Sequence, residues 1–118
     1  MYIISEWFPG NEVVNPALNA VLANTGAINK GGVTGTYCVF HFWVNSTVAT
    51  KLLLGVYNAV DTLVQSFPIL VPANQVVSFG SDTLGFQVPN NFRVKITAPA
   101  AIVGTVSASI IVGTFAAY

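Results

Sequence analysis

Stretches rich in Val, Ile, Thr, Phe and Tyr alternate along the chain with clusters of Gly, Pro, Asn, Asp and Ser. Such spacing of strand-forming runs and turn residues is typical of an all-β protein. The pattern predicts eight strands, over residues 18–24, 33–45, 50–57, 62–71, 75–79, 84–88, 92–98 and 102–112. Eight short strands favour a single antiparallel β-sandwich or jelly roll.

Two of these segments show which side of a strand faces the interior. Apolar side chains alternate with Arg93 and Lys95 in the segment 92–97, which is typical of a half-buried strand with its charged side in solvent. The segment 103–112 alternates too, but its polar side carries Thr and Ser and no charge. Pro68 interrupts an apolar run and has no N–H for a sheet, so we expect an edge strand, a bulge or two half-strands there.

Residues 37–44 are unusual because both sides of the predicted strand are apolar. One side carries Cys38, Phe40, Phe42 and Val44, and the other carries Tyr37, Val39, His41 and Trp43. Cys and Phe are more often fully buried, so we expect Cys38, Phe40 and Phe42 in the core. Tyr and Trp are enriched at protein interfaces, so the second side is predicted to contact another subunit.

The next predicted strand, 50–57, has a similar pattern, with Leu53 and Tyr57 on the side away from the core. Two such strands side by side would expose more apolar surface than a soluble monomer usually tolerates. We therefore predict a homo-oligomer whose interface comprises Tyr37, Val39, His41, Trp43, Leu53 and Tyr57. The alternative is a larger sandwich in which the first residues of the chain cover this face.

Residues 1–17 are interpreted as an N-terminal arm that precedes a sandwich domain of residues 18–118. The arm carries the large apolar residues Tyr2, Ile3, Ile4, Trp7 and Phe8, followed by the breaker Pro9-Gly10. Each of these side chains would gain about 1.5–3 kcal/mol from full burial, so we expect the arm to dock. It either adds an edge strand to its own sandwich or docks on another chain.

Composition narrows the functional classes. The chain has 118 residues, enough for one core, and only 7% are charged against roughly 25% in an ordinary domain. Four basic and four acidic side chains cancel, which argues against nucleic-acid binding. No apolar run approaches the roughly 18–20 residues of a membrane span, and the first ten residues lack secretory-signal features, so we expect a protein made in the cytoplasm with no membrane partner.

The sequence offers little for catalysis. Cys38 and His41 lie three positions apart in a predicted strand, so their side chains would point to opposite faces. The pair is also short of the three or four ligands that zinc needs. The carboxylates are Glu6, Glu12, Asp61 and Asp82, and no two have a reason to converge as acid and base. We therefore predict no enzyme, no metal site and no cofactor.

Four stretches carry a resemblance to a known family. They are residues 35–37, 71–79, 92–95 and 104–109, within a similar region that spans 33–113. This region resembles the small jelly-roll decoration, or cement, proteins of tailed-bacteriophage capsids. The resemblance implies a homotrimer on the capsid surface of a virion, made in the host cytoplasm, with the major capsid protein as partner. The arm would then reach a capsid subunit, with Trp7 and Phe8 as anchors.

Two other functions are compatible with the pattern. A carbohydrate-binding or receptor-binding jelly roll of a viral fibre or tail would need aromatic residues beside amides and carboxylates. Tyr57, Asn58 and Asp61 could supply such a site, as could Asn90 and Asn91. A fragment of a larger coat protein is disfavoured, because coat proteins usually need basic tails or larger domains.

Overall fold

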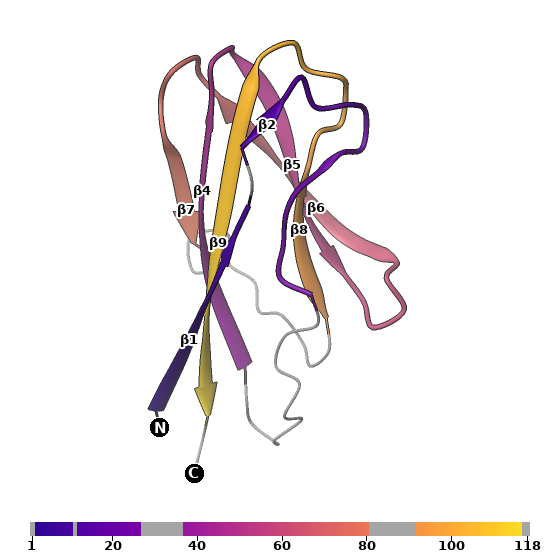
Figure 1. Cartoon of the computed structure of the whole chain (residues 1–118). Coiled ribbons are helices and arrows are strands. Elements are labelled where there is room, and N and C mark those ends of the chain that lie inside the picture. Colours follow the sequence, from indigo (N-terminus) through magenta and orange to yellow (C-terminus); the bar gives the residue numbers. More distant parts are fainter. Residues whose placement is uncertain (1, 11, 27–36, 81–91, 117–118) are drawn as a thin grey trace.

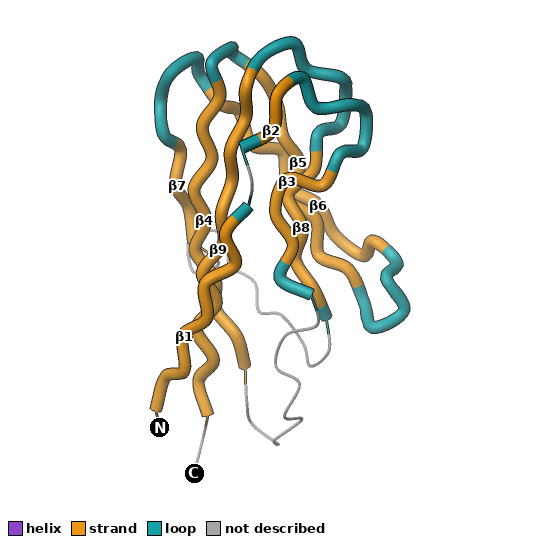
Figure 2. The backbone as a smooth tube through the Cα atoms, in the orientation of Figure 1, coloured by secondary structure: helices purple, strands orange, loops and turns teal. Residues whose placement is uncertain are grey.

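The structure is a computed structural model that describes residues 2–10, 12–26, 37–80 and 92–116, with the backbone alone at 2–6, 37–40, 79 and 112–116. These residues form strands and turns, arranged in two layers (Figure 1 and Figure 2). The strands are β1 (Tyr2–Pro9), β2 (Val13–Val14), β3 (Val21–Asn24), β4 (Tyr37–Ser46), β5 (Thr50–Tyr57), β6 (Leu63–Val71), β7 (Val77–Gly80), β8 (Arg93–Thr97) and β9 (Thr105–Ala116). Within the described ranges there is no helix that could cross a membrane.

The strands form two antiparallel sheets. The five-stranded sheet has the order β1-β9-β4-β7, with β2 also paired to β9, and the four-stranded sheet has the order β3-β8-β5-β6. The strands other than β2 pair in a nested way: β1 with β9, β3 with β8, β4 with β7 and β5 with β6. This is the winding of a jelly roll, and it confirms the predicted all-β sandwich.

The core lies between the sheets and comes from alternate residues of both. Phe42 of β4 is 1% exposed, as predicted, whereas the side chains of Cys38 and Phe40 are outside the described set. The predicted inner residues of β5 and β8 are also buried, and the core includes Phe42, Val44, Leu52, Leu54, Val56, Val94, Ile96, Val106 and Ile110. The period of two in the sequence therefore identified the buried side of each of these strands.

Several predicted boundaries agree with the structure. The segment 50–57 is β5, and β6 lies at the edge of its sheet, as Pro68 indicated. The predicted strand 84–88 and residues 33–36 lie outside the described residues. β3 begins at Val21, three residues later than predicted, because Leu18 and Asn19 form a turn in which Asn19 has a positive φ of 65°.

The N-terminal segment is part of the sandwich. β1 pairs with β9 along its whole length, from Tyr2 opposite Ala116 to Pro9 opposite Ser109. Phe8 packs against the core, and the Gly10 N–H donates to the Ala108 carbonyl at 2.9 Å. Of the two arrangements left open for residues 1–17, the structure shows the edge strand. Because β1 extends the sheet at its edge, it does not cover the outer face of β4 (Figure 1).

Candidate functional site

The six residues of the predicted oligomer interface lie on two different sheets. β4, with Tyr37, Val39, His41 and Trp43, belongs to the five-stranded sheet, whereas β5, with Leu53 and Tyr57, belongs to the four-stranded sheet. The expectation that these strands lie side by side is wrong, because the short connection after Ser46 carries the chain from one layer to the other. The side chains of Tyr37 and Val39 are outside the described set. The predicted patch is therefore two separate surfaces.

On the outer side of the five-stranded sheet, strand register brings residues from β1, β9, β4 and β7 into rows. One row contains Trp7, Ile111 and His41. The next contains Pro9, Ser109, Trp43 and Ser78, and a third pairs Ser107 with Asn45. Residues that are distant in the sequence thus share one face because β9 lies between β1 and β4.

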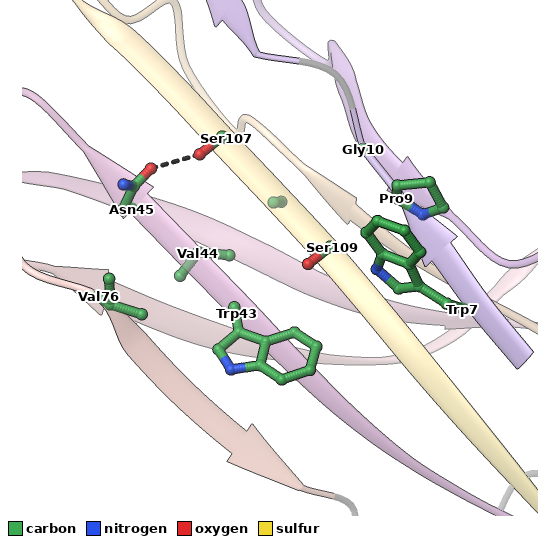
Figure 3. Close-up of a pocket in the computed structure, with 10 residues that line it drawn as sticks. Trp7, Pro9, Gly10, Trp43, Val44, Asn45, Val76, Ser107 and Ser109 are labelled. Atoms are coloured by element: carbon green, nitrogen blue, oxygen red, sulfur yellow. Dashed lines mark hydrogen bonds between the residues drawn. The ribbon is translucent and has the colours of Figure 1, made fainter. Parts of the chain in front are cut away.

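An open groove of about 390 Å³ crosses these rows (Figure 3). The chain has two tryptophans, Trp7 and Trp43, and both line it, on either side of the part of β9 that carries Ser107 and Ser109. Trp7 is 66% exposed and Trp43 is partly buried. The groove therefore presents indole rings to solvent on both sides of a hydroxyl-bearing strand.

Polar groups in the groove are uncharged. The Ser107 hydroxyl donates a hydrogen bond to Asn45 Oδ1, and no charged side chain is among the residues described as lining the groove. His41, one row away, is hydrogen-bonded to Ser78 through Nε2 and Oγ at 2.7 Å. The His41 ring meets the Trp43 indole edge-on, with centroids 5.4 Å apart, which helps to orient that indole.

A second hollow of about 280 Å³ adjoins the groove and shares Asn45 and Ser107 with it. Its other lining residues are Glu12, Ser46, Thr47, Asn74 and Thr105. The two hollows together form a path that is aromatic at one end and hydroxyl-rich at the other.

The outer side of the four-stranded sheet differs in charge. Lys51, Arg93 and Lys95, which are the Lys and Arg residues of the described part of the chain, all lie on β5 and β8. Lys95 Nζ is 2.8 Å from Asp61 Oδ1 and 4.5 Å from the centroid of the Tyr57 ring. The pKa of Asp61 is lowered chiefly by the hydrogen bond from Lys95, with the charges of Lys95 and Arg93 adding to the effect against a desolvation penalty.

The turn between β5 and β6 is held in one conformation by several contacts. Asn58 Oδ1 accepts hydrogen bonds from the N–H groups of Val60 at 3.1 Å and Thr62 at 2.9 Å. Arg93 Nη2 donates to the Ala59 carbonyl at 3.3 Å. Together with the Lys95–Asp61 pair, these contacts fix a hairpin that extends away from the five-stranded sheet (Figure 1).

Exposed apolar side chains collect on this hairpin and the adjoining strand β6. Val60 is 79% exposed and Leu70 is 74% exposed, and Leu63 and Val64 are also solvent-exposed. Leu53 and Tyr57 lie beside them on β5, where Leu53 is opposite Pro68 and Tyr57 is opposite Leu63. We call this set the hairpin surface; it comprises Leu53, Tyr57, Val60, Leu63, Val64 and Leu70.

The predicted sugar site around Tyr57 is engaged by the protein itself. Asn58 caps the turn, Asp61 pairs with Lys95, and Lys95 lies over the Tyr57 ring. The second predicted pair, Asn90 and Asn91, lies outside the described residues. Among the residues that are described, no three His, Cys, Asp or Glu side chains gather as metal ligands.

The groove was not predicted from the sequence, although two signals for it were present. Trp7 was assigned to an arm, so its place beside β9 was not anticipated. The uncharged polar side of the segment 103–112 was noted, but nothing local in the sequence shows that this side lies between two tryptophans.

Comparisons with known proteins support the fold. No family model matches the chain, and no curated protein matches it. One similar solved structure is a chain from Bacillus endospore appendages, described as a novel family of disulfide-linked pili. Its sequence identity to this chain is 13%, the alignment covers 98% of this chain and 89% of that chain, and the TM-score is 0.53. Another is the apo form of the carbohydrate-binding module BiXyn10A CBM1, with 12% identity, 98% and 97% coverage, and a TM-score of 0.49. The similarity to the first of these structures supports the all-β sandwich fold.

Proposed function

We propose that this protein is a non-catalytic structural subunit that associates with copies of itself through the hairpin surface. The observation that carries the proposal is the exposure of Val60, Leu63, Val64 and Leu70 along β6 and the turn before it. Exposed apolar residues are ordinary when scattered singly, but here four lie on one strand and its turn, with the partly buried Leu53 and Tyr57 on the neighbouring strand, which favours an interaction site.

The rigidity of the hairpin supports this role. The Asn58 cap and the Lys95–Asp61 pair hold the apolar side chains in place before any partner arrives. A preorganised surface loses little conformational entropy on binding, so more of the gain from burial appears as affinity. Charged groups adjoin the apolar residues, since Lys51 is opposite Leu70 and Arg93 is opposite Tyr57, and interfaces commonly combine apolar residues with polar ones at the rim.

Burial of the exposed side chains would contribute to the free energy of association. Full burial of a leucine is worth about 1.5–3 kcal/mol, and Leu70 is 74% exposed, so covering it would gain about 1–2 kcal/mol per copy. Several such side chains in each copy can offset part of the 4–15 kcal/mol cost of association. The assembly is then sensitive to the loss of one of these side chains.

We propose that the larger assembly to which this subunit belongs is a virion. The resemblance to capsid decoration proteins supports a homotrimer that sits on the capsid and contacts the major capsid protein. The pilus-type sandwich among the structural neighbours shows that a similar fold occurs in an assembled appendage. The low charge of the chain suits a subunit whose surface is largely covered by other subunits.

Light scattering on two matched variants tests the interface. Leu70→Glu places a carboxylate opposite Lys51, where the monomer tolerates it, but in the assembly this charge would have to be removed from water. Val103→Glu makes the same kind of change at a residue that is 85% exposed and lies in the loop between β8 and β9, outside the hairpin surface. We expect Leu70→Glu to reduce the mass toward 12.4 kDa and Val103→Glu to leave it unchanged. Equal masses for the two variants would reject the hairpin surface as the interface.

Immunogold labelling tests the location. Antibodies raised against the folded chain should label the outer surface of intact capsids in infected-cell lysates. Labelling confined to tail fibres, or absent from intact virions, would reject the decoration role while leaving the self-association result to stand on its own.

A further inference from the structure

We infer that the groove between Trp7 and Trp43 is a binding site for a neutral carbohydrate chain, whose sugar rings stack on the indoles. The inference goes beyond the proposed self-association and does not depend on it, because the groove and the hairpin surface lie on different sheets. The groove is on the outer face of β1, β9 and β4, whereas the hairpin surface belongs to β5 and β6.

The two indoles provide the apolar part of the site. Both tryptophans of the chain line the groove, and Trp7 leaves 66% of its surface in solvent. A sugar ring has an apolar face of C–H groups and a polar rim of hydroxyls, so a flat indole beside hydroxyl-bonding groups matches both parts. His41 supports this geometry because its ring packs edge-on to Trp43.

The strand register sets the length of ligand that the groove fits. Trp7 is opposite Ile111, and Trp43 is opposite Ser109, so the tryptophans are two strands apart and offset by two residues. At strand spacings of about 4.8 Å and rises of about 3.4 Å per residue, their Cα atoms are about 12 Å apart. One sugar ring is too short to stack on both indoles, so the site favours an oligosaccharide.

The polar groups between the indoles suit hydroxyls. Ser107 donates to Asn45 Oδ1, which leaves the Asn45 amide N–H groups free to donate to a ligand. Ser109 lies between Pro9 and Trp43, and no hydrogen bond to its hydroxyl appears among the described contacts. Hydroxyl and amide groups can donate and accept, as a sugar requires. The adjoining hollow, with Thr47 and Thr105, continues this lining.

Charge and polarity separate this ligand from its competitors. An anionic sugar or a nucleotide would find no cation in the described lining of the groove, since the described Lys and Arg residues lie on the other sheet. An apolar surface of a second copy would bury the Ser109 hydroxyl without a hydrogen-bond partner, which costs free energy. A sugar hydroxyl could supply that hydrogen bond. A neutral carbohydrate satisfies the indoles and the hydroxyl groups together.

Intrinsic fluorescence tests the inference directly, because every tryptophan in the protein lines the groove. The full chain is titrated with cellohexaose, xylohexaose, mannohexaose and maltohexaose, and with an acidic oligogalacturonate for comparison. We expect saturable emission changes with at least one neutral oligosaccharide and none with the acidic one. Isothermal titration calorimetry with that oligosaccharide then measures affinity in variants that lack one tryptophan.

Matched variants assign the binding to the groove. Trp7→Ala and Trp43→Ala should each weaken binding by about tenfold, whereas Trp43→Phe should retain part of it. Tyr57→Ala removes an aromatic side chain from the opposite sheet and should leave the affinity unchanged. Circular dichroism identifies any variant that fails to fold. If an alanine variant fails to fold, the affinities of Trp43→Phe and Ser109→Ala are used to test the site instead.

Three results would overturn the inference. One is the absence of an emission change with all four neutral oligosaccharides. The second is an equal loss of affinity in Tyr57→Ala. The third concerns the Leu70→Glu variant. If its tryptophan emission shifts with protein concentration while its mass rises, a second copy covers the groove.

Discussion

Substitution of Gly10 by alanine should weaken the attachment of β1 to the sandwich. A Cβ at residue 10 would lie 2.2 Å from the carbonyl oxygens of both Ala108 and Leu22. These oxygens belong to β9 and β3, one in each sheet, so neither is the flexible end of a side chain. The backbone of residue 10 must therefore move away from both sheets.

The cost follows from the contacts that this movement breaks. The hydrogen bond from Gly10 N to Ala108 O, 2.9 Å long, is worth about 1 kcal/mol, and overpacking costs about 1–3 kcal/mol. The sum, about 2–4 kcal/mol, is a large fraction of the 5–15 kcal/mol that stabilises an ordinary domain. At about 4 °C per kcal/mol for a chain of this size, Tm should fall by roughly 8–16 °C.

Thermal unfolding followed by circular dichroism measures this loss, and hydrogen exchange shows whether protection disappears first in β1. Gly26→Asn is the control, because nothing lies within 4 Å of an added Cβ there and asparagine tolerates its φ of +65°. An unchanged Tm for Gly10→Ala, with β1 still protected, would show that the close approach of Gly10 to the two sheets is not real.

Three further predictions concern the core and the hairpin. Phe42→Ala should destabilise the protein by about 3–5 kcal/mol in urea denaturation, since Phe42 is 1% exposed; a loss below about 1 kcal/mol would contradict its central place. Thr25→Val removes the acceptor of the Val94 N–H at 3.1 Å in a buried position and should cost about 1–3 kcal/mol, which the same assay would detect. Asp61 has a lowered pKa, so its pairing with Lys95 stabilises the fold at neutral pH, and this contribution is lost as pH falls through that pKa. Asp61→Asn should therefore be less stable than the unchanged protein near pH 7 and equal to it near pH 2; a gap of the same size at both values would contradict the pairing.

The sequence predicted the buried side of most strands but not their arrangement in layers. The period of two in 50–57 and 92–97 identified Leu54 and Ile96 as core residues, because a half-buried strand must alternate. The same period of two does not indicate which sheet a strand joins. β4 and β5 both carry apolar residues on their inner sides, so their separation into two sheets depends on a three-residue connection that has no distinctive signal.

The candidate sites were harder to predict because they depend on contacts between distant segments. Trp7 and Trp43 share one face because β1 and β4 both pair with β9, which lies about a hundred residues further along the chain than Trp7. Leu53 and Tyr57 were predicted to lie on the side of their strand away from the core, and both belong to the hairpin surface. Val60, Leu63 and Val64 were not anticipated, because exposure at a hairpin depends on how far the turn extends from the sheet.

Sedimentation velocity of the unmodified chain over a range of micromolar concentrations most directly tests whether the apolar hairpin surface joins copies together. We predict a species heavier than the 12.4 kDa chain, with a proportion that rises with concentration and a mass three times that of the chain if the assembly is a trimer. A single 12.4 kDa species at every concentration would contradict it.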